Sequence, residues 1–270
     1  MIRGRLINLS TLSRIATGNT AEVFAFEDSK VLKVYFSGYP EDEAENEAAK
    51  ALFAYQQGLT TPKVIDVLEV ESRPALIFER CLGPSLDSYL LKHPNDIVPM
   101  GELFAGLHAD IHRCQAQPLD TTAQRLALKI QRSNIAEPLK LKAINQLNLQ
   151  ALDSRLCHGD FHPANVLLSS NGPVTIDWVD ATQGQPISDV ARTVLLISTS
   201  QIAGSQVEQQ AYQLKKQQFL AAYQQHYHQL CSTNNHQLST WTPIVAAERL
   251  SEKLPDASAT QTLEIAQQLV

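Results

Sequence analysis

The order of apolar and polar residues divides the chain into a β-rich beginning and a largely helical remainder. In the first eighty residues, short runs of β-branched and aromatic residues are separated by small polar turns, which predicts strands. One helix, 40–57, interrupts them. It opens with three acidic residues, carries apolar residues at helical spacing and ends before Gly58. Strands are expected at 12–16, 22–26, 31–36, 63–70 and 73–78.

Beyond residue 84 the apolar residues recur mainly at helical spacing. One exception is an apolar run at 166–168, a Ser-Ser-Asn-Gly-Pro turn and a second run at 174–176, which predict a hairpin. Another helix is expected to start with Thr242 as N-cap and Pro243 in its first turn. Further helices are expected at 85–92, 100–114 and 205–231.

These elements predict an α+β protein with two lobes. A small, mainly β N-terminal lobe with one key helix spans 1–80, and a larger, mainly helical C-terminal lobe spans 84–270. The boundary between them falls at 81–83, because the last predicted strand runs directly into the turn residues Gly83 and Pro84. A chain of 270 residues is long enough for two such cores.

Composition narrows the functional classes. The content of 44% hydrophobic and 19% charged residues is ordinary for a globular protein, and the net charge of -6 argues against a nucleic-acid partner. Four scattered cysteines form no C-x-x-C pair, which favours free thiols in a reducing compartment. We find no secretory signal and no membrane-spanning stretch, so we expect a cytoplasmic protein with no membrane contact and no evident protein partner.

The residues with the clearest chemistry lie in the stretch LCHGDFHPANVLLSSNGPVTIDW, 156–178. Asp160 and Asn165 precede the predicted hairpin, and Asp177 follows it. Phosphoryl transfer needs one carboxylate to orient an incoming hydroxyl, and it needs oxygen ligands to hold Mg²⁺ on the nucleotide phosphates. This short segment therefore contains side chains of the types that phosphoryl transfer needs.

The spacing His158-Gly159-Asp160-x-x-x-x-Asn165, followed by Ile176-Asp177-Trp178, resembles the protein-kinase pattern. The HGDFHPAN and IDW variants more closely resemble the aminoglycoside phosphotransferase and choline kinase family. This resemblance implies a protein-kinase-like fold and an ATP (or GTP) and Mg²⁺ requirement. It also implies that Asp160 is the catalytic base and that Asn165 and Asp177 are the metal ligands.

The same resemblance assigns the phosphate-binding lysine. Lys33 stands in the third predicted strand, where the family has a lysine that contacts the α- and β-phosphates. Its expected partner is Glu47, which lies on the edge of the buried stripe of helix 40–57, whereas Glu45 falls away from that stripe. Without the resemblance, Lys33 also fits an exposed edge strand and Glu47 a solvated helix face.

Two further nucleotide contacts are implied. The turn Gly18-Asn19-Thr20, between the first two predicted strands, would cover the phosphates with backbone N–H groups. The resemblance also implies that residues 81–83 are the hinge between the lobes, where the Glu79 carbonyl and the Cys81 N–H would bind adenine. Because these contacts are made by the backbone, the side chains themselves say little about them.

Several polar and aromatic residues are expected to be structural. Asp189 resembles the kinase aspartate that accepts hydrogen bonds from the catalytic-loop backbone. His108 and His112, four residues apart on a predicted helix, lack the glutamate of an H-E-x-x-H zinc site and favour a packed helix. Tyr223 and Tyr227 belong to an aromatic stripe of helix 205–231 that we interpret as core rather than as a cage for a quaternary ammonium.

The function predicted is transfer of a γ-phosphoryl group to a hydroxyl of a small aminoglycoside-, choline- or homoserine-like acceptor. Few acidic residues lie on the last helices, and basic residues such as Arg249 balance them, which argues against a polycationic antibiotic. One alternative is a catalytically silent nucleotide-binding regulator of the same fold. Another is a metal-dependent hydrolase that uses His158, Asp160 and His162 as ligands.

Overall fold

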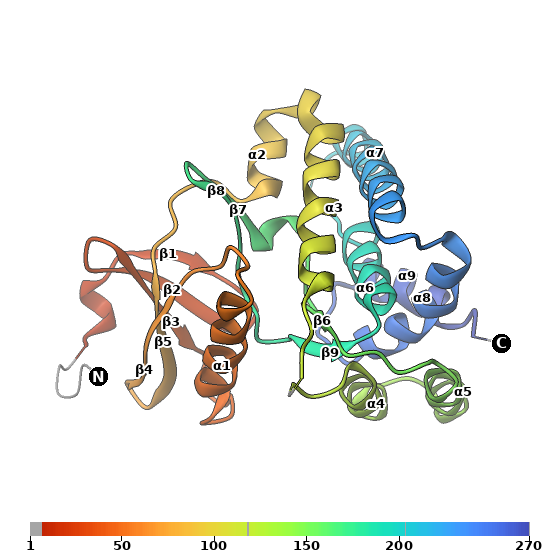
Figure 1. Ribbon diagram of the computed structural model, residues 1–270, viewed down its shortest axis with the longest axis horizontal. Coiled ribbons are helices and arrows are strands. Elements are labelled where there is room, and N and C mark those ends of the chain that lie inside the picture. Colours follow the sequence, from red (N-terminus) through yellow and green to blue (C-terminus); the bar gives the residue numbers. More distant parts are fainter. Residues whose placement is uncertain (1–6, 118, 203, 270) are drawn as a thin grey trace. The chain divides into compact units, whose positions relative to one another are not determined.

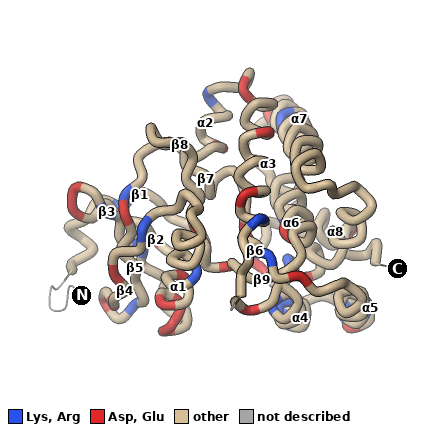
Figure 2. The backbone as a smooth tube through the Cα atoms, viewed as in Figure 1, with Lys and Arg blue, Asp and Glu red and all other residues tan. Residues whose placement is uncertain are grey.

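The computed structural model describes residues 7–117, 119–202 and 204–269 and divides the chain into two compact units (Figure 1). The first unit comprises Met1–Leu86 and Ala164–Asp180, and the second comprises Asp87–Pro163 and Ala181–Val270. Figure 2 shows acidic and basic residues interspersed along the backbone of both. Among the described residues, no helix combines the length and apolar character needed to span a bilayer.

A five-stranded antiparallel sheet in the order β1-β2-β3-β5-β4 forms the body of the first unit. Alternate residues of β3 face opposite sides, so Leu32 and Val34 join one apolar core while Tyr35 packs with the alanines of α1 on the other face. Each predicted strand is present within two residues of its expected ends. The bounds are β1 Arg14–Thr17, β2 Ala21–Phe26, β3 Lys30–Tyr35, α1 Glu43–Gln56, β4 Val64–Val70 and β5 Arg73–Glu79, after a 3₁₀ turn at Leu9–Thr11.

The predicted hairpin is β7 (Val166–Ser169) and β8 (Gly172–Thr175), preceded by the 3₁₀ turn Pro163–Asn165. Residues 164–180, which we expected in the C-terminal lobe, are part of the first unit. Backbone hydrogen bonds explain the grouping, because the Leu168 N–H donates to the Pro84 carbonyl and the Thr175 N–H donates to the Thr60 carbonyl, both at 2.9 Å.

The second unit is mainly helical, as predicted. Its helix α3 packs along α7, and α8 packs against both α6 and α9 (Figure 1). Two short strands, β6 and β9, pair antiparallel and lead into the segment that carries Asp160 and into α6, respectively. The bounds are α2 Leu86–Lys92, a 3₁₀ turn Pro94–Asp96, α3 Ile97–Arg113, α4 Thr122–Arg132, α5 Glu137–Asn148, β6 Arg155–Cys157, β9 Thr182–Gly184, α6 Pro186–Ser198, α7 Gln206–Cys231, α8 Asn235–Arg249 and α9 Asp256–Ala266.

The start of α8 was wrongly predicted. The helix begins at Asn235 rather than after Thr242, and Pro243 lies inside it. Asn234 caps it, since its side chain accepts hydrogen bonds from backbone N–H groups of the first turn and the Gln237 side chain accepts from the Asn234 N–H. The proline removes one backbone hydrogen bond, but the burial of residues such as Trp241 on both sides keeps the helix continuous.

Candidate active site

Lys33 is a buried cation in the middle of the first unit's sheet. Strand β3 lies between β2 and β5, which excludes the edge-strand alternative, and the Lys33 side chain is only 11% exposed. Its Nζ lies 2.8 Å from Oε1 of Glu47 and 2.8 Å from Oδ1 of Asp177. Burial disfavours the ammonium, but the two carboxylates outweigh that effect and raise the pKa of Lys33. The lysine is therefore permanently charged at physiological pH.

Glu47 reaches Lys33 because α1 turns that side chain toward the sheet. It is 1% exposed, between the buried residues Ala44 and Ala48, and the predicted ion pair with Lys33 is present. Its second oxygen, Oε2, accepts a hydrogen bond from the Tyr35 hydroxyl. Both carboxylate oxygens are thus occupied, which fixes the glutamate that holds the lysine.

Asp177 and Asn165 lie at the two ends of the β7–β8 hairpin. The Ile176 N–H donates to the Asn165 carbonyl at 3.0 Å, which brings the backbone of the two predicted metal ligands together. Asp177 has a φ of 67°, a left-handed conformation that is costly for a residue with a side chain and is concentrated at functional sites. The carboxylate is nevertheless fixed by its contact with Lys33.

The residues after Asp177 tie this segment to the rest of the first unit. The buried Trp178 donates its Nε1–H to the Thr61 hydroxyl at 2.9 Å. The Lys50 ammonium, from α1, donates to the Val179 carbonyl at 2.7 Å. Because both bonds join 178–179 to distant parts of the same unit, they hold the strained Asp177 backbone in place.

Asp160 belongs to the second unit, in the loop between β6 and the Pro163–Asn165 turn. Its Oδ2 lies 3.5 Å from His162 Nε2, and its Oδ1 lies 3.7 Å from Arg192 Nη2. Burial alone would raise the pKa of Asp160, but the hydrogen bond from His162 and the charges of His162 and Arg192 hold it well below its usual range. The carboxylate is therefore ionised and able to accept a hydrogen bond from a hydroxyl.

The backbone around Asp160 is held by Asp189, as predicted. The His158 N–H donates to Oδ2 of Asp189 at 2.6 Å, and the Gly159 N–H donates to its Oδ1 at 2.9 Å. Arg192, one turn further along α6, donates its Nε–H to the Gly159 carbonyl. Two side chains of one helix thereby fix the peptide groups immediately before the candidate base.

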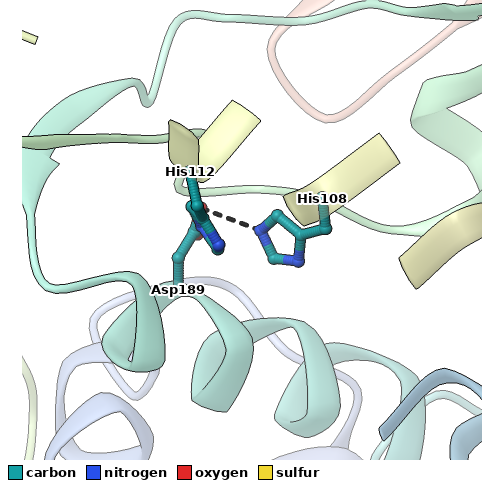
Figure 3. Close-up of side chains that lie close together, drawn as sticks. All are labelled: His108, His112 and Asp189. Atoms are coloured by element: carbon teal, nitrogen blue, oxygen red, sulfur yellow. Dashed lines mark hydrogen bonds and ion pairs between the residues drawn. The ribbon is translucent and has the colours of Figure 1, made fainter. Parts of the chain in front are cut away.

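The two α3 histidines complete this support. His108 and His112 lie against Asp189, which projects from α6 (Figure 3). Their Nε2 atoms are 3.1 and 3.3 Å from Asp189 Oδ2, and their Nδ1 atoms are 2.7 and 2.6 Å from the hydroxyls of Tyr223 and Tyr227. Burial, with the neighbouring histidine, lowers the pKa of His108 to about 3, so it is neutral and donates through Nε2. The tyrosines are core residues, as predicted.

The hydrolase alternative required His158, Asp160 and His162 to act together as metal ligands. Within the described part of the chain, the one trio whose ligand atoms lie within 4.8 Å of one another is instead His108, His112 and Asp189. Those atoms already take part in hydrogen bonds, which favours a structural role for the trio. His158 is fully buried, and its Nδ1 accepts from the Asp160 N–H at 3.2 Å.

The remaining predicted contacts are turn and strand-end residues of the first unit. Gly18-Asn19-Thr20 forms the turn between β1 and β2, closed by the Gly18 N–H, which donates to the Ala21 carbonyl at 2.9 Å. A Cβ at Gly18 would meet only that carbonyl oxygen, at 3.8 Å, so neither space nor φ demands glycine there. Glu79 is the last residue of β5, and Cys81 follows in the connection to α2. Their nucleotide contacts stay predictions.

Two site residues were missed by sequence reasoning. Tyr35 is two residues from Lys33, and the two-residue period of a strand places both on the face toward Glu47. That signal was available. Arg192 contacts Gly159 and Asp160, residues more than thirty positions away, and no local pattern identifies such a pairing.

Two features of this chain are typical of kinase-like phosphotransferases. The first unit has a sheet lysine held by a helix glutamate, and the second has an ionised aspartate on a helix-supported loop. The chain belongs to the phosphotransferase enzyme family, whose model matches residues 11–233. A comparison with curated proteins finds no match.

Solved structures of this fold are similar over nearly the whole chain. The amicoumacin kinase hAmiN, in complex with AMP-PNP, Ca²⁺ and Ami, has a TM-score of 0.66 at 12% identity and covers 97% of this chain and 88% of its own. The aminoglycoside-3'-phosphotransferase of type VIII has a TM-score of 0.64 at 16% identity, with coverages of 87% and 91%. A thermostable mutant of aminoglycoside phosphotransferase APH(4)-Ia, in a ternary complex with AMP-PNP and hygromycin B, has a TM-score of 0.64 at 17% identity. The match covers 96% of this chain and 93% of that one.

Proposed function

We propose that the chain is a small-molecule kinase that transfers the γ-phosphoryl group of ATP (or GTP) to a hydroxyl of its acceptor. The observation that carries this proposal is that the Lys33 ammonium is held between Glu47 and Asp177. These three residues are far apart in the sequence, and such a group is typical of the nucleotide site in this fold. AMP-PNP in the complexes of hAmiN and of the APH(4)-Ia mutant supports the choice of nucleotide.

On the nucleotide side, Lys33 binds the α- and β-phosphates while Glu47 fixes its position. The Gly18-Asn19-Thr20 turn covers the phosphates, and the backbone of Glu79 and Cys81 binds the base. The side chains of Asn165 and Asp177 hold Mg²⁺, since amide and carboxylate oxygens are ligands that it accepts. When bound, the metal neutralises charge that develops on the transferring phosphoryl group.

Asp160 acts on the acceptor. Its ionised carboxylate accepts a hydrogen bond from the acceptor hydroxyl and then its proton, as the hydroxyl oxygen forms a bond to the γ-phosphorus. The bond from that phosphorus to the bridging oxygen of the leaving nucleoside diphosphate breaks. His162 and Arg192 keep Asp160 charged, and Asp189 keeps its loop in place.

The acceptor we propose is an aminoglycoside-, choline- or homoserine-like compound. Hygromycin B in the complex of the APH(4)-Ia mutant and Ami in that of hAmiN support a multifunctional alcohol. Of the three candidate types, only the homoserine-like compound carries a carboxylate.

The test measures phosphate transfer from labelled ATP or GTP with Mg²⁺ to a library of alcohols and to water. Asp160→Asn should lower the rate by roughly 10²–10⁴-fold, because a general base contributes about that much. The Kd for AMP-PNP should change little.

Asp110→Asn is the matched control, since it removes an exposed carboxylate of α3. It should transfer at the parent's rate. If Asp160→Asn also does so, the assigned base is wrong. If the parent binds AMP-PNP but transfers to no alcohol and not to water, the catalytically silent regulator is the correct function.

A further inference from the structure

Arg249, the last residue of α8, is a buried cation with unused donors. The residue is only 9% exposed. Of the buried side-chain nitrogen and oxygen atoms in the described residues, the only two without a hydrogen-bond partner are its Nε and Nη1. A buried donor left unpaired is costly, and more so on a charged group. Such a group in a folded protein requires an explanation.

The carboxylates next to Arg249 in sequence are used by other cations. Glu248 accepts from Arg192 Nη1 at 2.6 Å and pairs with the Lys129 ammonium at 2.8 Å. Glu252 accepts from Arg192 Nη2 at 2.7 Å and lies 3.5 Å from the same ammonium. Burial lowers the pKa of Arg249, partly offset by the charge of Glu252. No protein carboxylate within the described residues forms an ion pair with Arg249.

The same group of side chains includes the candidate base. Arg192 joins Glu252 at 2.7 Å to Asp160 at 3.7 Å through one nitrogen, Nη2, and the Asp160 charge also acts on Arg249. All of these residues lie in the second unit. Glu252 and Asp160 keep 30% and 27% of their side-chain surface exposed, so the cluster is open to solvent on their side.

A purely structural role explains Arg249 less well. A cation in the last turn of a helix is favoured by the helix dipole, and such side chains often donate to the last carbonyls. The two unpaired nitrogens make no such bond. A guanidinium binds a carboxylate or phosphate through a pair of parallel N–H donors, either Nε with Nη2 or Nη1 with Nη2. Each of these two pairs in Arg249 includes one of the unpaired nitrogens.

We propose that Arg249 binds a carboxylate or phosphate group of the acceptor, the same molecule whose hydroxyl gives its proton to Asp160. This inference rests on the proposed function and deepens it, because it makes the acceptor an anionic alcohol. A polycationic acceptor would leave the guanidinium unpaired and would add like charge beside it. The homoserine-like class satisfies the requirement, and the choline-like class does not.

The first arm of the test compares phosphate transfer to four matched three-carbon alcohols: glycerol, glycerate, glycerol 3-phosphate and 3-amino-1,2-propanediol. We expect kcat/KM for an anionic member to exceed that for glycerol by roughly 10- to 100-fold, the range for a hydrogen-bonded charge pair. The two anionic members distinguish carboxylate from phosphate. In Arg249→Gln the ratio should fall toward one, and in Arg132→Gln, which removes an exposed arginine of α4, it should stay at the parent's value.

The second arm needs no turnover. Sodium sulfate should raise the thermal unfolding midpoint of the parent and of Arg132→Gln more than that of Arg249→Gln, with sodium chloride at equal ionic strength as reference. The general salting effect of sulfate acts on all three proteins and cancels in the comparison. Because this arm measures binding alone, it decides the inference even if phosphate transfer, and with it the proposed function, fails.

Arg249→Lys provides a second variant in case Arg249→Gln does not fold. It keeps the charge but loses the parallel donor pairs, so it should keep only part of the anion preference and of the sulfate response. The inference is overturned if the parent prefers the neutral or the cationic alcohol. It is equally overturned if a folded Arg249 variant responds to sulfate and selects anions as the parent does, or if the parent shows neither anion preference nor a sulfate-specific shift.

Discussion

Tyr35 shows how much one hydroxyl contributes to a charged site. Lys33 and Tyr35 share a face of β3, and Glu47 receives a hydrogen bond from each. The Lys33 ammonium also lies 5.4 Å from the centre of the Tyr35 ring, close enough for a cation–π contact. The tyrosine therefore supports both members of the ion pair.

Tyr35→Phe should lower the free energy of unfolding by about 1.5–3 kcal/mol, the usual contribution of a hydrogen bond to a charged group. The ring and its packing are kept, but one oxygen of the buried Glu47 loses its donor. Urea denaturation measures the change. Tyr55→Phe, an exposed tyrosine of α1, should leave the free energy unchanged. Equal stabilities of the two variants would contradict the assigned role.

At the scale of helices, α3 and α7 approach closely at a glycine. A Cβ on Gly101 would lie 2.9 Å from the Ala222 Cβ and 3.0 Å from the Phe219 carbonyl oxygen. Both distances are shorter than a relaxed contact, and one partner is backbone, so α7 would have to move. Gly106, on the same helix, has nothing within 4 Å of its Cβ position.

The two glycines should therefore respond oppositely to alanine. Gly106→Ala should stabilise the protein by up to about 1 kcal/mol, the difference in helix propensity. Gly101→Ala gains the same propensity but should be destabilising overall, by about 1–3 kcal/mol, because overpacking outweighs the gain. Thermal or urea unfolding distinguishes them. A stabilised Gly101→Ala would mean that α3 and α7 pack less tightly than described.

The junction of α3 and α6 makes stability depend on pH through His108. Its folded pKa of about 3 lies below the ordinary value of about 6.5. Between these values the unfolded chain binds a proton that the folded chain does not, so stability falls as pH falls through this window. The slope due to His108 approaches about 1.4 kcal/mol per pH unit. Asp189, whose pKa is also lowered, adds to the loss below about pH 4.

His108→Gln should flatten this dependence, as measured by urea denaturation at several pH values between 7.5 and 4.5. His236→Gln, an exposed histidine of α8, should keep the parent's curve, shifted at most slightly. If the parent and His108→Gln lose stability in parallel on acidification, His108 is not the neutral buried residue described here.

At the scale of the whole molecule, nucleotide binding should appear as stabilisation. Mg²⁺ with AMP-PNP at a hundred times its Kd should add about 2.7 kcal/mol, equivalent to roughly 5–10 °C in the unfolding midpoint. EDTA should remove most of that shift. Asp177→Asn should reduce it strongly, whereas Glu45→Gln, on the exposed side of α1, should show the parent's shift. A full shift in EDTA would contradict the metal ligands proposed.

Much of this architecture was predictable because its signals are local. Five strands and α1 followed from alternation, turn residues and one apolar stripe, and the same stripe selected Glu47 over Glu45. Leu52 and Tyr55, which the stripe predicted to be buried, are exposed. Asn234 was overlooked as a cap because Thr242-Pro243 has the more familiar pattern, and burial along α8 determined the outcome.

The features that could not be predicted from the sequence depend on contacts between residues far apart in the chain. Arg192 pairs with Glu248, fifty-six positions away, and Arg249, which follows Glu248 directly, keeps two side-chain nitrogens unpaired. Neither fact leaves a periodic trace in the sequence.

The grouping of residues 164–180 with the first unit also affects how the protein is made. Chain elongation from the N-terminus produces the five-stranded sheet early. The hydrogen bonds from Trp178 to the Thr61 hydroxyl and from the Lys50 ammonium to Val179 form only after residues 178 and 179 leave the ribosome. The contact between Lys33 and Asp177 likewise forms only after residue 177 has been synthesised. A nascent or truncated fragment that ends near Leu86 therefore contains Lys33 and Glu47 but lacks the Asp177 carboxylate, the second partner of Lys33.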